Sequence, residues 1–284
     1  MTLLNAALRP IFDLLQAPLR SLPPWAGILI WSIPIGVLTL WVFKKTSNQR
    51  RIAEVKRKIH ACLFEIRLFN DDMAAILRAQ GEILRHVVHY QALALKPMIF
   101  ILPPLVLLMV QLHAFYGFRG FEPGERTLVR AVLASDTGER SDQYQSRPPV
   151  ALELPAGLRL DGDAVWAPAL GETLWQVVVE EAGDYELAFR VGDEVIRKTL
   201  RATDAVVRLS PTRPEHSFMD QLEWPSEDPL PRSSGLSEIS VAYPDGSVAF
   251  ASWDFEWRYA WMVVFFVLTM VVAVALRKPL GVEL

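Results

Sequence analysis

The chain has 284 residues, of which 51% are hydrophobic and 21% are charged, with one Cys and a net charge of −3. A mean hydropathy of +0.22 with so few charges argues against a disordered, a nucleic-acid-binding or a disulfide-stapled protein. The near-zero net charge hides opposite charges on separate segments.

Residues 1–24 are predicted to form an amphipathic helix. Over residues 3–19 one helical stripe is apolar, and the opposite face carries Asn5, Arg9, Asp13 and Gln16. Such a helix lies in the outer interface of a bilayer, although a leader that packs on the outer domain has the same pattern. Ahead of Trp25 the sequence has neither the charged start nor the small-residue cleavage site of a signal peptide. We therefore expect this segment to be retained in the protein.

Three windows are long and apolar enough to be membrane spans. A bilayer core about 30 Å thick needs roughly 20 apolar residues in a helix. Residues 25–43, 97–117 and 259–276 carry no ionised side chain if His113 is neutral. We therefore predict three transmembrane helices, with buried helices of a soluble protein as the alternative.

The charges between these windows orient the chain. Residues 44–96 hold 11 Lys or Arg and five Asp or Glu, a net charge of +6. Residues 118–256 hold 13 Lys or Arg and 25 Asp or Glu, a net charge of −12. Basic residues also follow the last span within the tail, residues 277–284. The positive-inside rule places the segment 44–96 and the tail in the cytoplasm. We expect a bacterial inner (plasma) membrane protein with its N-terminus and residues 118–256 outside, in the periplasm or extracellular space.

The cytoplasmic segment is predicted to be an antiparallel coiled-coil hairpin. Apolar residues recur at helical spacing from Gln49 to Leu95, and the break falls at Asn70-Asp71-Asp72, where Asx side chains favour a turn and a cap. This pattern gives two helices of roughly 20 residues each. A basic cluster lies at the membrane end: Lys44, Lys45, Arg50, Arg51, Lys56, Arg57 and Lys58. It suits anionic lipid, and the ribosome or a nascent chain is the alternative partner.

Residues 118–256 are predicted to form an extracytoplasmic antiparallel β-sandwich. Short β-rich runs occupy residues 127–133, 150–154, 173–180, 185–191 and 195–200, separated by turn residues. The runs 175–179 and 183–187 are expected to pair as a hairpin. Trp166 and Trp175 are expected to fill the core rather than to bind a ligand.

The end of this domain is predicted to return to the membrane. Residues 210–236 hold five prolines and are expected to be an extended loop. A last hairpin is expected to pair residues 239–243 with residues 248–252. An aromatic belt then follows at the outer interface: Trp253, Trp257, Tyr259 and Trp261.

Several residues in the spans could shape or wet a groove between the helices. Prolines remove backbone hydrogen bonds and bend helices, and polar side chains at membrane depth are costly and often functional. The candidates are Ser32, Pro34, Thr39, Pro103, Pro104, Gln111 and His113. Adjustment of helix packing explains the same prolines equally well.

Enzyme chemistry is not expected. The sequence contains no GxSxG, Walker, HExxH or dinucleotide motif, and the outer acidic residues are scattered at turns. His86 and His89 are three residues apart, but no acidic or Cys partner lies at ligand spacing beside them, so we expect neither metal nor cofactor. Cys62 is expected to be a packed small residue.

The layout resembles the core of the YidC/Oxa membrane-insertase superfamily, including its archaeal YidC-like type. The resemblance covers residues 3–117, from APLRSLPPWAGILIWSIPIGVLTLWVF through QRRIAEVKRKI to KPMIFILPPLVLLMVQL, plus the last span. It implies a client-binding groove open to the cytoplasm and a hairpin that recruits client or ribosome. Bacterial members carry a groove arginine in the first span, and residues 25–43 contain none; the β domain between the last two spans is a further departure.

Two functions are therefore expected. The first is a YidC-like insertase or chaperone, or an assembly factor derived from one, that binds client segments between its spans. The alternative is a non-catalytic scaffold subunit of an envelope complex, whose β domain binds a periplasmic partner or a glycan. The expected partners are membrane lipids and either client membrane proteins or other subunits, with no specific nucleic acid.

Overall fold

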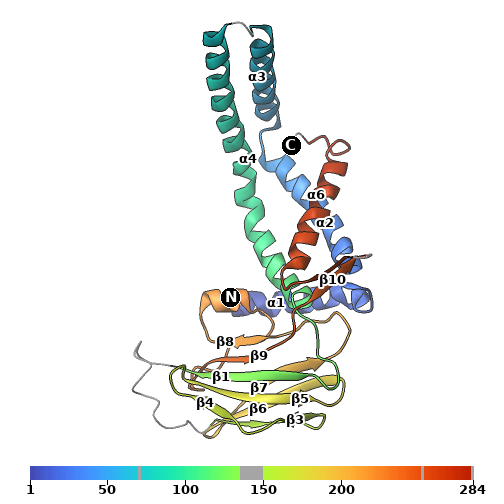
Figure 1. Cartoon of the computed structure of the whole chain (residues 1–284), viewed down its shortest axis with the longest axis vertical. Coiled ribbons are helices and arrows are strands. Elements are labelled where there is room, and N and C mark those ends of the chain that lie inside the picture. The colour runs from blue at the N-terminus through green and yellow to red at the C-terminus, as the bar shows by residue number, and fades with distance from the viewer. Residues whose placement is uncertain (70–71, 135–149, 251–252, 283–284) are drawn as a thin grey trace. The chain divides into compact units, whose positions relative to one another are not determined.

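The computed structural model describes residues 1–69, 72–134, 150–250 and 253–282 (Figure 1). The chain forms two compact units. One contains residues 1–27 and 107–263, and the other contains residues 28–106 and 264–284. Helices α2 (Pro24–Thr46), α4 (Met73–Tyr116) and α6 (Ala260–Leu276) each have residues in both units.

The predicted hairpin is confirmed. Helix α3 spans Gln49–Leu68 and helix α4 spans Met73–Tyr116, and the two run side by side in Figure 1. The Asn48 side chain accepts a hydrogen bond from the Arg51 amide at 3.1 Å and caps α3. Asp72 Oδ1 accepts one from the Ala74 amide at 2.9 Å at the start of α4. Asn70 and Asp71 of the predicted turn lie outside the described residues.

The second hairpin helix is longer than expected, because α4 continues without interruption into the apolar segment. It has 44 residues and includes Pro97, Pro103 and Pro104. The paired helices bury Ile52, Val55, Cys62 and Ala79. Helix geometry therefore persists through Pro103 and Pro104, which were expected to bend the span.

Within the residues that the structure describes, two helices have the length and apolar composition that a bilayer crossing needs. They are α2, Pro24–Thr46, and the stretch Ile76–Tyr116 of α4. Helix α6, Ala260–Leu276, is apolar throughout and has 17 residues. At 1.5 Å per residue α6 extends about 26 Å, slightly less than a typical hydrocarbon core.

The N-terminal segment is helical as predicted. Helix α1 spans Thr2–Gln16 and is followed by a 3-10 turn, η1, over Ala17–Leu19. Both elements belong to the unit that contains the β domain.

The β domain consists of antiparallel sheets around one core. The larger sheet has the strand order β3-β5-β1-β9-β8, with β4 also paired to β5; the second has the order β2-β6-β7; and β10 pairs with β11. The strands are β1 Arg126–Leu133, β2 Val150–Glu153, β3 Leu158–Leu160, β4 Val165–Ala167, β5 Glu172–Val179, β6 Gly183–Val191, β7 Glu194–Ala202, β8 Thr212–Pro214, β9 Leu236–Val241, β10 Ser247–Phe250 and β11 Trp253–Glu256.

The two main sheets share their hydrophobic core, so the sandwich prediction is confirmed at the level of layers (Figure 1). Trp175 of β5 packs edge-on against Phe189 of β6 across the sheets, with ring centroids 5.7 Å apart. Both side chains are buried. Trp175 is therefore a core residue, as expected, while Trp166 is half-buried.

Two predicted strand pairings are wrong. The runs in β5 and β6 do not form a hairpin: β5 pairs with β1, β3 and β4, and β6 pairs with β2 and β7. The hairpin is instead β6–β7, closed by Gly192-Asp193, where Gly192 has a φ of +59° that a two-residue turn favours.

The last predicted hairpin is also wrong, since β9 pairs with β1 and β8 while β10 pairs with β11. Residues 251 and 252 of the expected strand lie outside the described residues. The segment 210–236 is not a bare loop, because it contains β8 and the short helix α5, Phe218–Glu223.

Candidate functional site

Ser32 of α2 lies on a face of that helix that packs against α6. Ile28, Ser32, Gly36 and Leu40 recur every four residues, and all four are buried. The Ser32 hydroxyl donates to the Ile28 carbonyl at 2.8 Å and reaches the Phe265 carbonyl at 3.5 Å. A Cβ on Gly36 would lie 2.8 Å from Val272 Cγ1 of α6, so the glycine permits the close approach. Ser32 is thus a packing residue within this unit.

The other groove candidates divide between the two compact units. Pro34 is exposed and Thr39 half-buried on α2, and Pro103 and Pro104 are exposed on α4, all in the unit with the hairpin. Gln111 and His113 belong to the unit with the β domain. A groove that joins all seven residues stays a prediction.

His113 and Gln111 make specific contacts inside their own unit. His113 Nδ1 accepts a hydrogen bond from the Trp261 indole at 3.2 Å, and its ring stacks on Tyr259 with centroids 5.6 Å apart. Trp261 is 1% exposed and is therefore a packing residue, whereas Trp257 and Tyr259 of the predicted belt are exposed. The side chain of Trp253 lies outside the described residues.

Arg208 joins the β domain to α1 and to the end of α4. Its Nε donates to Asp13 Oδ1 at 2.8 Å, its Nη1 donates to Gln111 Oε1 at 2.9 Å, and its guanidinium lies 4.7 Å from the centroid of the Phe115 ring. The Arg208 side chain is only 7% exposed. Burial lowers the pKa of Arg208 and Asp13 opposes this shift, so the carboxylate stabilises a guanidinium that stays charged.

The polar face of α1 is bound to the β domain rather than to water. Arg9 uses all of its guanidinium nitrogens on residues 225–228: Nε to the Pro225 carbonyl at 2.6 Å, Nη2 to the Glu227 carbonyl at 2.7 Å and Nη1 to Asp228 Oδ1 at 2.7 Å. Asn5 Nδ2 donates to the Gln221 carbonyl of α5 at 2.7 Å, and α5 lies beside the start of α1 in Figure 1.

The apolar face of α1 remains uncovered in the described structure. Its exposed side chains are Leu3, Leu4, Ile11, Leu14 and Leu15, and exposed Phe218 and Met219 of α5 extend the surface. The N-terminal helix therefore packs its polar side on the domain, as one of the two alternatives expected, while its position in a membrane interface stays a prediction.

A buried ion pair anchors the segment that holds α1. Lys198 of β7 is fully buried, and its Nζ lies 3.0 Å from Glu227 Oε2. Lys198 also donates to the Ser210 hydroxyl at 3.0 Å and to the Ser210 carbonyl. The Thr199 amide and hydroxyl donate to Glu227 Oε1. Burial alone would raise the pKa of Glu227, but Lys198 and the Thr199 hydrogen bonds outweigh it and lower the pKa. Nothing in the sequence marked this pair.

The basic residues of the hairpin lie on its exposed surface and at its junction with α2. Lys44 Nζ donates to the Leu280 carbonyl at 2.6 Å, and the ammonium groups of Lys45 and Lys56 lie over the rings of Trp41 and Tyr90. Arg50, Arg57 and Lys58 are exposed. A groove on the hairpin is lined by Arg51, Glu54, Val55, Lys58, Arg85, His86, Val88, His89 and Ala92.

Large apolar side chains are exposed around the far end of the hairpin. They are Leu63, Phe64, Leu68, Phe69, Met73, Leu77 and Leu84, each between 47% and 75% exposed. We call this set the apolar tip. Exposed apolar surfaces of this kind are typical of sites that contact a protein partner or a membrane.

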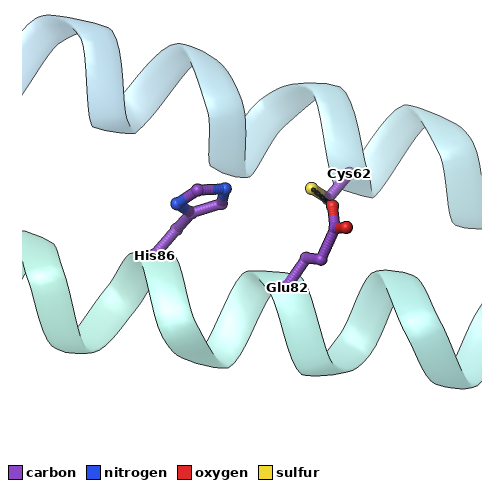
Figure 2. Close-up of side chains that lie close together, drawn as sticks. All are labelled: Cys62, Glu82 and His86. Atoms are coloured by element: carbon purple, nitrogen blue, oxygen red, sulfur yellow. Dashed lines mark hydrogen bonds between the residues drawn. The ribbon is translucent and has the colours of Figure 1, made fainter.

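Cys62 and Glu82 lie beside His86, which the sequence analysis did not anticipate. Cys62 Sγ donates to Glu82 Oε2 at 3.6 Å across the hairpin (Figure 2). Burial and the neighbouring carboxylate of Glu82 raise the pKa of the Cys62 thiol. The expectation that no acidic or Cys partner lies near His86 is therefore wrong, while His89 is outside this group.

Comparison with known proteins returns no family model, no curated protein and no solved structure that matches this chain. The function must therefore be argued from the residues themselves.

Proposed function

We propose that the protein is a three-span membrane protein of YidC/Oxa-like insertase or chaperone type, or an assembly factor derived from one. The observation that carries this proposal is the apolar tip on a helical hairpin whose other end is basic. Apolar client segments match the tip, and anionic lipid or a nascent chain matches the basic end.

The proposed topology places the hairpin in the cytoplasm and the β domain outside. The +6 and −12 charges of these segments support it. The uncovered apolar face of α1, with Phe218 and Met219, would lie in the outer interface of the bilayer. Trp257 and Tyr259 are exposed in the same compact unit and suit the same interface.

We expect single cysteines to report this orientation in a Cys62→Ser background. In intact spheroplasts, Val195→Cys in β7 should react with a membrane-impermeant maleimide, because Val195 is 53% exposed in the outer domain. Leu68→Cys in the hairpin should react only after the membrane is permeabilised, although Leu68 is 75% exposed and so more accessible than Val195. The opposite pattern would contradict the proposed orientation.

We expect the apolar tip to be needed for client insertion. The protein should restore insertion of a single-span client in cells depleted of their YidC-type insertase, measured by protease accessibility of the client. The variant Phe64→Ser/Leu68→Ser/Phe69→Ser should lose this rescue, because it removes three exposed apolar contacts without touching the buried hairpin core.

The matched control is Arg67→Ser/Arg78→Ser, which changes one exposed polar residue on each helix of the hairpin near the same end. It should rescue as the parent protein does. A tip variant that rescues fully would contradict client capture at the hairpin.

A second function, a scaffold subunit of an envelope complex, is favoured by one specific observation. Ser32 and Gln111, two polar residues proposed to wet a client groove, are buried and hydrogen-bonded. Failure of the parent protein to rescue insertion, together with co-purification at fixed stoichiometry with other membrane proteins, would support the scaffold function over the first.

A further inference from the structure

Three metal-ligating side chains from both helices of the hairpin converge between them. Cys62 comes from α3, and Glu82 and His86 come from α4, four residues apart and so on one helical face. One ligand atom from each lies within 4.8 Å of the other two. Figure 2 shows the thiol and the carboxylate facing each other, with the imidazole beside them between the helices.

The separations are close to those of a bound transition metal. Metal–sulfur bonds of about 2.3 Å and metal–nitrogen or metal–oxygen bonds of about 2.0–2.1 Å put tetrahedral ligands roughly 3.3–3.7 Å apart. Cys62 Sγ and Glu82 Oε2 already lie 3.6 Å apart. Closing the widest separation requires a shift of about 1 Å, which the exposed Glu82 and half-buried His86 side chains can supply by rotation.

We propose that the hairpin binds one zinc-type divalent ion through Cys62 Sγ, a carboxylate oxygen of Glu82 and an imidazole nitrogen of His86. A water molecule completes the tetrahedron, as in sites with three protein ligands. The thiol releases its proton to solvent on binding. The ionised Cys62 and Glu82 then balance the double positive charge of the ion.

The donor set determines which ions are expected. A thiolate and an imidazole favour zinc and cobalt, whereas magnesium and calcium prefer oxygen donors. Without an ion, the Cys62 thiol faces the Glu82 carboxylate, and Glu65 adds a second negative charge nearby. A cation relieves this concentration of acidic groups in a way that the weak thiol–carboxylate hydrogen bond cannot.

The ion would join α3 to α4 a short distance from the apolar tip. Cys62 and Glu82 enclose the end of the hairpin, which contains most of the tip residues. Metal binding would therefore fix the register of the two helices where the apolar side chains are displayed. This property does not depend on whether the tip binds a client or a scaffold partner.

Cobalt titration of the full-length, metal-free protein in detergent tests the site. We expect one cobalt ion per chain, with a thiolate-to-cobalt charge-transfer absorption and visible bands of tetrahedral intensity. Zinc should displace the cobalt, whereas magnesium and calcium should not. Hydrogen exchange of the α3 amides near Cys62 should slow when zinc is added.

The variants Cys62→Ala and His86→Gln should each weaken cobalt binding at least tenfold, and Cys62→Ala should also abolish the charge-transfer band. His89→Gln, one helical turn further along α4 and outside the cluster, should bind as the parent does. Absence of the charge-transfer band in the parent protein would overturn the proposal, as would a band that survives Cys62→Ala. The charge-transfer band of the parent protein tests the proposed site even if a variant fails to fold.

Discussion

Replacing Lys198 by methionine is expected to destabilise the β domain by about 3–5 kcal/mol. Lys198 is fully buried, and methionine fills nearly the same volume, so the effect reports the lost charge rather than a cavity. Glu227 would keep its Thr199 hydrogen bonds but lose its counter-ion in a site where the carboxylate side chain is only 13% exposed. At about 2–4 °C per kcal/mol for a domain of this size, the melting temperature should fall by roughly 10 °C.

The double variant Lys198→Met/Glu227→Met is the decisive control. It removes both charges, and a buried ion pair replaced by apolar residues of similar volume is often neutral or stabilising. We therefore expect the double variant to recover most of the lost melting temperature. Arg190→Met, which breaks an exposed pair with Glu153, should change stability by less than about 1 kcal/mol. A double variant less stable than either single variant would contradict the charge argument.

The Lys198–Glu227 ion pair is also expected to make the stability of the β domain sensitive to acid. The pKa of Glu227 is lower in the folded protein than its ordinary value of 4.5, so the stabilisation is complete above that value and is lost as the pH falls through the lowered pKa. Melting curves recorded at decreasing pH should show this loss in the parent protein. The double variant should lose less, because it has no carboxylate at this position.

Helices and individual strands could be predicted because their signals are local. The 3.6-residue period predicted α1 and α3, uninterrupted apolar length predicted the apolar helices, and β-rich runs bounded by turn residues predicted β1, β5, β6 and β7. Strand partners could not be predicted in this way. The chain between β5 and β6 passes from one sheet to the other over only three residues, 180–182, and so looks locally like a hairpin turn.

The contacts that the polar face of α1 makes with the β domain could not be predicted from the sequence for a different reason. Its polar face has the pattern of a solvated surface, yet Asn5, Arg9 and Asp13 bind residues more than 190 positions later in the chain. Periodicity shows that a face is polar but not whether water or protein satisfies it. The proline-rich segment 210–236 is the part of the sequence that supplies α5 and the 225–228 acceptors.

The Cys62 cluster, by contrast, had a signal in the sequence. The predicted turn is centred on residue 71, and Cys62 lies nine residues before it and Glu82 eleven residues after it. Folding the two helices about that point places the two side chains at nearly the same height, with His86 one turn away from Glu82. The two histidines at helical spacing, His86 and His89, lie on a single helix, whereas the ligand partner of His86 comes from across the hairpin.

Replacing Arg208 by methionine is expected to release α1 from the β domain. The loss leaves the Gln111 amide, which is 1% exposed, without its guanidinium donor, and it removes the cation–π contact with Phe115. These two effects together correspond to about 2–4 kcal/mol. Asp13 adds little, because its side chain is 41% exposed and water can replace the arginine there. Hydrogen exchange of the α1 amides in detergent should accelerate more than that of the core strand β5.

Two comparisons separate the geometry of this contact from its charge. Arg208→Lys keeps the positive charge but has no planar fork to reach Asp13 and Gln111 together, so its exchange rates should fall between those of the parent and of Arg208→Met. Arg197→Met breaks an exposed pair with Glu186 on the same domain and should leave α1 unchanged. If Arg208→Met left α1 exchange at the parent rate, the three guanidinium hydrogen bonds of Arg9 would be sufficient to hold the helix, and Arg208 would serve only to bind the end of α4.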